Sequence, residues 1–156
     1  MKKVNIQKLT LAALLTSIAV VGSMLSFPIG VSKCAPVQHL VNVIGAIFLG
    51  PSYSVGIAFV ASLLRNLIGL GTLLAFPGSM LGALLAGLLF KYTKKMIFAY
   101  AGELVGTSIL GGIVSFPIAK FMLGSESAAL FGLVIPFFVS SAGGTIIAII
   151  ACTALK

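Results

Sequence analysis

The chain has 156 residues, 60% of them hydrophobic and only 8% charged, with ten Lys and Arg against two Asp and Glu. Soluble domains contain roughly a quarter of charged residues, so this composition excludes a water-soluble globular protein and indicates an integral membrane protein. The net charge of +8 does not indicate a nucleic-acid partner, because the basic residues stand at the ends of apolar runs and do not form one patch.

The apolar runs are long and lack the alternation of barrel strands. They therefore predict helices, whose backbone groups pair within one segment in lipid. The 18 glycines fit a bundle in which helices approach one another closely. We predict an all-α integral membrane protein, with six transmembrane helices in one compact bundle and a single domain over residues 1–156.

A short basic arm, residues 1–8, precedes the first predicted helix at residues 9–27. A cleaved signal peptide is the alternative here, but the run is longer than a typical signal core and no clean cleavage site follows it. The other five helices are predicted at residues 36–49, 52–68, 73–90, 96–116 and 128–155. Pro77 and Pro136 are expected to mark the start of the regular helix in the fourth and sixth segments.

Six crossings put both chain ends on one side of the membrane. The basic residues that then share this side are Lys2, Lys3, Lys8, Lys91, Lys94, Lys95 and Lys156. The positive-inside bias places that side in the cytoplasm. Cys34 and Cys152 fall at opposite faces, which excludes a disulfide between them.

The most polar interruption between the first two helices is the stretch 31–42, VSKCAPVQHLVN. It holds the only His of the chain and one of its two Cys, and Pro36 stops a helix from running straight through it. We expect this loop to form one wall of a small-molecule site at the membrane surface. Its candidate residues are Lys33, Cys34, Gln38, His39 and Asn42.

Polar residues inside the apolar runs extend this candidate site. Arg65, with Asn66 beside it, lies roughly 20 Å along a helix that starts on the inner side, and a charge there usually faces a cavity or a partner. Glu103, the only acid in a spanning run, lies about 10 Å into the bilayer. A buried carboxylate needs a cation or donors, or it keeps its proton, so Glu103 has three possible roles: to bind ligand, to pair structurally or to transfer a proton.

Lys33 and Lys120 are expected at the outer face, where they either serve the site or extend into the headgroups. The dipeptide Phe-Pro occurs three times, at residues 27–28, 76–77 and 116–117, and each copy falls at the outer boundary of the predicted bundle. Either these prolines simply end helices, or the phenylalanine rings line an aromatic outer pocket.

Small residues recur at a spacing of four, which puts them on one helix face where another helix can approach closely. The fourth segment has Gly78, Gly82 and Ala86 in this register. The first segment has Ala12 with Thr16 and Ala13 with Ser17, which predicts packing inside the bundle or against a partner subunit.

Several motifs are absent from the sequence. There is no GxxxxGK[ST] for ATP, and no HExxH, GxSxG or carboxylate pair for hydrolysis, so we expect neither an enzyme nor a cofactor or metal. As a membrane enzyme the chain offers only Cys34 and His39 as nucleophile and base, without an orienting acid nearby in sequence. A standalone channel would need a polar path, yet the inner halves of the helices are almost wholly apolar.

Residues 33–90 contain the motifs KCAPVQH, FLGP, LLRN and AFPGSMLGA. In this combination the chain resembles the substrate-binding S components of energy-coupling-factor (ECF) vitamin transporters, most closely the ThiW group assigned to thiazole uptake. The resemblance implies six helices with cytoplasmic ends in a prokaryotic plasma membrane. It also implies a vitamin-related ligand under the loop between helices 1 and 2.

The resemblance further implies a transmembrane coupling protein and two cytoplasmic ATPase subunits as partners, and an S subunit that tips over in the bilayer. Carried over to this sequence, the docking face is Ala12, Ala13, Thr16 and Ser17. The expected ligand is hydroxyethylthiazole or its phosphate; another vitamin or anionic precursor is the alternative. The predicted ligand-binding residues are Lys33, Gln38, His39, Asn42, Arg65, Asn66, Phe76 and Glu103.

Overall fold

The computed structural model describes residues 5–30, 32–124 and 131–154. The predictions for Lys2, Lys3, Lys156 and residues 128–130 lie outside this part of the chain. In order, the elements are α1 (Ile6–Gly22), η1 (Ser23–Leu25), β1 (Phe27–Ile29), β2 (Ser32–Cys34), α2 (Pro36–Phe48), α3 (Pro51–Leu67), α4 (Ala75–Thr93), α5 (Met96–Val105), η2 (Gly106–Gly111), α6 (Gly112–Pro117), η3 (Ile118–Met122) and α7 (Val134–Ala154).

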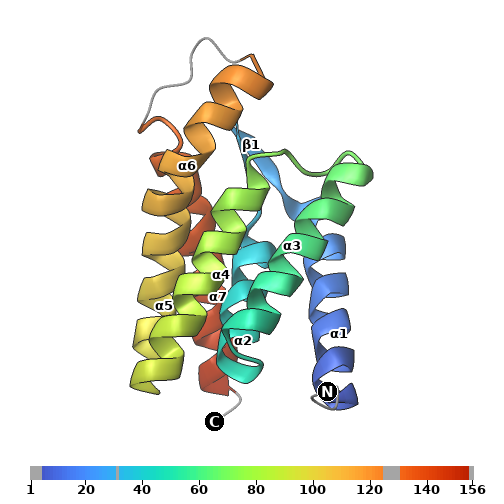
Figure 1. The fold of residues 1–156 in the computed structure, drawn as a ribbon, viewed down its shortest axis with the longest axis vertical. Coiled ribbons are helices and arrows are strands. Elements are labelled where there is room, and N and C mark those ends of the chain that lie inside the picture. Colours follow the sequence, from blue (N-terminus) through green and yellow to red (C-terminus); the bar gives the residue numbers. More distant parts are fainter. Residues whose placement is uncertain (1–4, 31, 125–130, 155–156) are drawn as a thin grey trace.

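The short helix α2 lies at the centre of the bundle, where it contacts α1, α3, α4, α5 and α7 (Figure 1). Helix α1 begins and α7 ends at one end of the bundle, and we call this the basic end. The β1–β2 hairpin, the link from α3 to α4 and the end of η3 gather at the other end (Figure 1), which we call the hairpin end.

Proline and glycine set the start of the two helices that follow the hairpin. Pro36 and Pro51 occupy the first turns of α2 and α3, where the missing N–H costs no helical hydrogen bond. Gly50 turns the chain between these helices with φ +88°, a conformation that glycine adopts without a steric penalty. The predicted bounds of the second and third helices are therefore correct to within one residue.

The predicted C-terminal end of the first helix, at residue 27, is wrong. Helical structure stops at Leu25, and Phe27 pairs with Cys34 in the antiparallel hairpin. The expectation that Pro77 and Pro136 mark helix starts is wrong by two residues, because α4 begins at Ala75 and α7 at Val134. Both prolines lie in the first helical turn, where backbone N–H groups have no intrahelical acceptor.

The fifth predicted helix does not end at residue 116. Helical structure continues without a break from Met96 to Met122, through Pro117. Two π-helical segments, η2 and η3, interrupt the α-helical geometry, and the second follows Pro117 directly. Wider π turns re-pair backbone groups where a proline removes a donor, so the helix passes a residue that usually stops one.

By length and composition, the described residues contain four helices that could cross a membrane: Ile6–Leu25, Ala75–Thr93, Met96–Met122 and Val134–Ala154. The apolar α2 has 13 residues and extends about 20 Å, less than the ~30 Å of a hydrocarbon core. The outward faces of α1, α3, α5 and α7 expose large aliphatic and aromatic side chains, as a lipid-facing surface requires.

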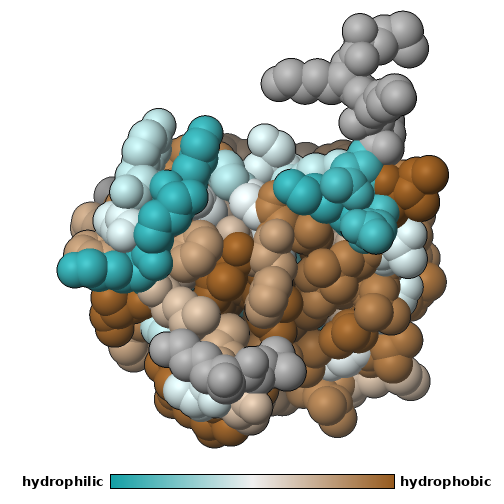
Figure 2. All heavy atoms as spheres, turned by 90° about the horizontal axis from the view of Figure 1, so that it is seen from below, coloured by the Kyte–Doolittle hydropathy of each residue, from teal (hydrophilic) through white to brown (hydrophobic). Residues whose placement is uncertain are grey.

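The described lysines at the basic end are Lys8, Lys91, Lys94 and Lys95, all exposed. Figure 2, viewed from this end, shows hydrophilic side chains in two groups at the margin of a largely hydrophobic surface. At the basic end, charge thus lies at the rim of the bundle, where water and headgroups can solvate it.

Candidate functional site

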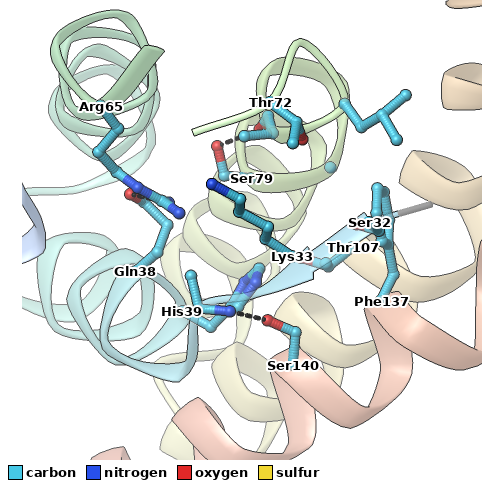
Figure 3. Close-up of a pocket in the computed structure, with 14 residues that line it drawn as sticks. Ser32, Lys33, Gln38, His39, Arg65, Thr72, Ser79, Thr107, Phe137 and Ser140 are labelled. Atoms are coloured by element: carbon cyan, nitrogen blue, oxygen red, sulfur yellow. Dashed lines mark hydrogen bonds between the residues drawn. The ribbon is translucent and has the colours of Figure 1, made fainter. Parts of the chain in front are cut away.

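A polar cavity opens at the hairpin end, between α2, α3, α4 and α7 and under the hairpin (Figure 3). Its empty volume is about 390 Å³, including the mouth. The lining residues are Ser32, Lys33, Ala35, Gln38, His39, Arg65, Thr72, Leu74, Ala75, Gly78, Ser79, Thr107, Phe137 and Ser140. Four of the eight predicted ligand-binding residues, Lys33, Gln38, His39 and Arg65, are among them.

The guanidinium of Arg65 is buried in the wall of the cavity, with the residue 2% exposed. Its Nη1 donates to Gln38 Oε1 at 3.3 Å, and Gln38 Nε2 donates in turn to Asn42 Oδ1 at 3.3 Å. The Arg65 Nε has no hydrogen-bond partner among the described residues. The last turn of α3 therefore presents a cation to the cavity with donor capacity to spare.

His39 lines the cavity from α2, and Glu103 of α5 lies behind it. His39 Nδ1 is 2.7 Å from Glu103 Oε1, and the same oxygen accepts from Asn42 Nδ2 and from Thr107 Oγ1, each at 3.0 Å. Glu103 is fully buried. Three donors on one oxygen suit a carboxylate, and they orient the imidazole so that its other nitrogen, Nε2, remains for the cavity.

The network depends on the close approach of α4 to α5. A Cβ on Gly82 would overlap Thr107 Oγ1 and lie 2.8 Å from Glu103 Oε2. Asn42 Nδ2 also donates to the Ser79 carbonyl at 3.0 Å, which ties α2 to α4. Asn42 and Glu103 thus do not line the cavity but hold His39 from behind.

The hairpin is attached to α7 by two contacts. Cys34 Sγ lies 3.3 Å from Pro136 O, and the Ala35 N–H donates to Ser140 Oγ at 2.8 Å. From β2 the exposed Lys33 extends over the cavity (Figure 3), where its Nζ lies 3.4 Å from both Gly69 O and Leu70 O. Lys33 therefore joins the hairpin to the link between α3 and α4.

Asn66 and Phe76 do not line the cavity. Asn66 Nδ2 donates to Ser62 O at 2.8 Å and to Thr72 O at 3.1 Å, so it fastens the link after α3. The Phe76 ring packs on Phe59, with centroids 5.7 Å apart. The aromatic ring that does line the cavity is that of Phe137.

Sequence reasoning missed Thr107, Phe137 and Ser140. Thr107 is one helical turn after Glu103, a spacing that puts both on one face. Ser140 and Ser141 are the first polar pair in the most apolar segment. This pair was the feature of the sequence that could have placed α7 at the site. Nothing in the sequence distinguished Phe137 from the other phenylalanines.

Cys34 does not form the nucleophile–base pair considered from the sequence. It is fully buried, and burial raises the pKa of its thiol, so the reactive thiolate is disfavoured. His39 does have an orienting acid, supplied by α5 and not by the adjacent sequence. Cys34 and Cys152 are both free thiols, in agreement with the prediction that they form no disulfide.

A second hollow lies on the side of the bundle between α1 and α3, with an empty volume of about 1020 Å³, open space at its mouth included. We call it the α1–α3 groove. The four predicted docking residues, Ala12, Ala13, Thr16 and Ser17, lie on its α1 wall. Its α3 wall includes Gly56, beside which a Cβ would meet open space.

Comparisons with known proteins agree on one family and one fold. A family model described as thiamine-precursor transporter protein (ThiW) matches residues 9–156. A solved structure, described as the S component of a bacterial ECF transporter, superposes with a TM-score of 0.80 at 19% sequence identity. The match covers 96% of this chain and 95% of that chain. No curated protein matches the chain.

Proposed function

Because the chain belongs to the ThiW family of thiamine-precursor transporter proteins, we propose that it is the substrate-capture subunit of an ECF-type importer. Its ligand is a thiamin-precursor thiazole, hydroxyethylthiazole or its phosphate. The observation that carries this proposal is the polar cavity at the hairpin end, enclosed by α2, α3, α4 and α7. Membership of a transporter family also agrees with the prediction that the chain is not an enzyme.

The chemistry of the cavity suits a small heteroaromatic ring with a polar substituent. Phe137, Leu74 and Gly78 provide an apolar wall for a flat ring, and a few placed polar groups fix its orientation, as in most small-molecule sites. In this proposal Gln38, His39, Arg65 and Lys33 contact the ligand. Asn42 and Glu103 hold His39 in place, and Asn66 fastens the link after α3. Phe137 takes the stacking role first expected for Phe76.

We further propose one domain, residues 1–156, that crosses the plasma membrane of a prokaryote six times with both ends in the cytoplasm. The distribution of charge supports this arrangement. Four exposed lysines lie at the basic end, whereas the hairpin end carries Lys33, Arg65 and Lys120. The positive-inside rule then orients the basic end toward the cytoplasm and the cavity toward the exterior.

The proposed partners are a transmembrane coupling protein and two cytoplasmic ATPase subunits, with the α1–α3 groove as the docking surface. The lining includes Ala12, Ala13, Thr16, Ser17, Ser52 and Gly56, small residues that let a helix from a partner approach closely. The bundle itself has no nucleotide-binding loop in its sequence, so the energy for import has to come from these partners.

Replacing Gly56 with phenylalanine tests the docking surface. Gly56 lines the α1–α3 groove, and a Cβ there would meet no atom within 4 Å, so the larger side chain is expected to occupy the groove. We expect at least a tenfold loss of co-purification with the coupling protein and the ATPases, while ligand binding by the isolated subunit is unchanged. Val114→Phe, on the exposed face of α6, is the control, and equal loss in both variants would contradict the assignment.

Calorimetry on the purified full-length protein tests the ligand. We expect binding of hydroxyethylthiazole or its phosphate, and no comparable binding of thiamin or of the pyrimidine precursor. Gln38→Ala is expected to weaken thiazole binding about tenfold, as loss of one hydrogen bond to a ligand does. Tight binding of thiamin alone would overturn the thiazole assignment.

A further inference from the structure

The guanidinium of Arg65, at the hairpin end of the bundle, is a buried charge with few hydrogen-bond partners among the described residues. It is 2% exposed, and its only hydrogen bond to a side chain among the described residues is the 3.3 Å contact with Gln38 Oε1. Its Nε is buried with no partner in the same part of the chain. A guanidinium carries five N–H donors, and burying one without a counter-charge is costly.

No acid in the described residues supplies that counter-charge. The only ion pair found there joins Glu103 to His39, and the bonded oxygen of Glu103 already accepts from Asn42 and Thr107. The other oxygen, Oε2, is buried without a partner among these residues, and no ion pair joins it to Arg65. The Arg65 cation lines the cavity itself, so an anionic ligand there would meet a charge that no acid of the described residues neutralises.

Two further features of the same cavity favour negative charge. Lys33 also lines it, and the contacts of its ammonium with the described residues are two backbone carbonyls at 3.4 Å. The start of the 19-residue helix α4 contributes Ala75, Gly78 and Ser79 to the lining. The Ala75 and Phe76 N–H groups donate to Thr72 O and Leu73 O, so this end of α4 offers an anion the positive end of the helix dipole.

We propose that this cavity binds an anionic ligand, a phosphate monoester whose oxygens lie between Arg65 and Lys33. The inference rests on the proposed function and narrows it, because it selects the phosphorylated thiazole over the neutral alcohol. A tetrahedral dianion uses several donors at once, and an arginine fork with a nearby ammonium offers them. His39 and Gln38 then remain for the heteroaromatic part of the ligand.

The experiment compares hydroxyethylthiazole with its monophosphate ester as ligands of the full-length protein in lipid nanodiscs, by titration calorimetry. We expect the ester to bind about 10- to 100-fold more tightly than the alcohol, the range for one or two charge-assisted hydrogen bonds. If the alcohol binds as tightly as the ester, the anion proposal is overturned and the thiazole function stands. If neither ligand binds, both proposals fail.

Substitutions locate the anion. Arg65→Gln and Lys33→Gln are each expected to reduce the preference for the ester about tenfold or more and to change the affinity for the alcohol much less. Lys120→Gln is the matched control, because Lys120 is an exposed cation in η3 that does not line the cavity. If Arg65→Gln does not fold, Lys33→Gln decides, since that side chain is exposed. An unchanged preference for the ester in Lys33→Gln would contradict the proposal.

Discussion

Replacing Glu103 with leucine is expected to lower the free energy of unfolding by about 3 kcal/mol and the melting temperature by roughly 6 to 12 °C. The change leaves His39 Nδ1, Asn42 Nδ2 and Thr107 Oγ1 without the oxygen to which they are bonded. Hydrogen bonds between membrane helices average about 0.6 kcal/mol each. The two lost bonds that join α5 to α2 therefore amount to about 1 kcal/mol; the bond from Thr107 lies within one helix, and the buried donors left unpaired add the rest of the loss.

Glu103→Gln is the control for this prediction. The glutamine carbonyl can still accept from the same donors, so we expect less than half of the destabilisation while the negative charge is lost. Thermal unfolding of the purified protein in one detergent, followed by circular dichroism, measures both. A leucine variant as stable as the unmodified protein would show that the network does not hold the bundle together.

Gly144→Ala is the second substitution for which we expect a large effect. Gly144 lets α7 pass directly against the start of α2: an added Cβ would overlap Pro36 O and lie 2.6 Å from His39 Cβ and 2.8 Å from Leu40 N. Two of these atoms belong to the backbone, so α2 has to shift. Overpacking of this kind costs about 1–3 kcal/mol, and the shift moves His39 away from both Glu103 and the cavity. We expect at least a tenfold loss of thiazole affinity.

The adjacent Gly143→Ala serves as the control. A Cβ at Gly143 would meet Pro36 Cβ and Cγ at 3.5 Å, an ordinary van der Waals distance. Alanine is also the better helix former by about 1 kcal/mol, so Gly143→Ala is expected to be neutral or slightly stabilising and to bind ligand normally. Equal affinities in the two variants, measured by calorimetry, would contradict the role assigned to Gly144.

Composition and the positions of proline and glycine were sufficient to predict the class of protein and most of its helices. The apolar runs identified the membrane helices, and Pro36, Gly50 and Pro51 marked the boundaries of α2 and α3 to within one residue. Prediction failed at Pro117 and at residue 27. In each case the outcome depends on backbone pairing, through π turns at Pro117 and through a strand partner at Phe27, and local propensity does not encode that pairing.

The residues of the candidate site were likewise predicted only in part. Lys33, Gln38 and His39 lie in one short polar stretch, and Arg65 is a charge in an apolar helix, so the sequence singled out these four of the 14 residues that line the cavity. Asn66 was grouped with them because it follows Arg65, and Phe76 because Phe-Pro recurs at the outer boundary of the predicted bundle. Their side chains point elsewhere, Asn66 to the Thr72 carbonyl and Phe76 to Phe59.

By itself, then, the sequence determined that this is an integral membrane protein. It also determined which residues are too polar to face lipid and which family the chain resembles. Only the tertiary structure decided which of those residues meet. His39 and Glu103 are 64 positions apart, and they pair because glycines in α4 and α7 let helices from distant parts of the chain approach closely. Hydropathy indicates which segments are excluded from water. Which helices then pack together depends on the shape of the helix surfaces in contact.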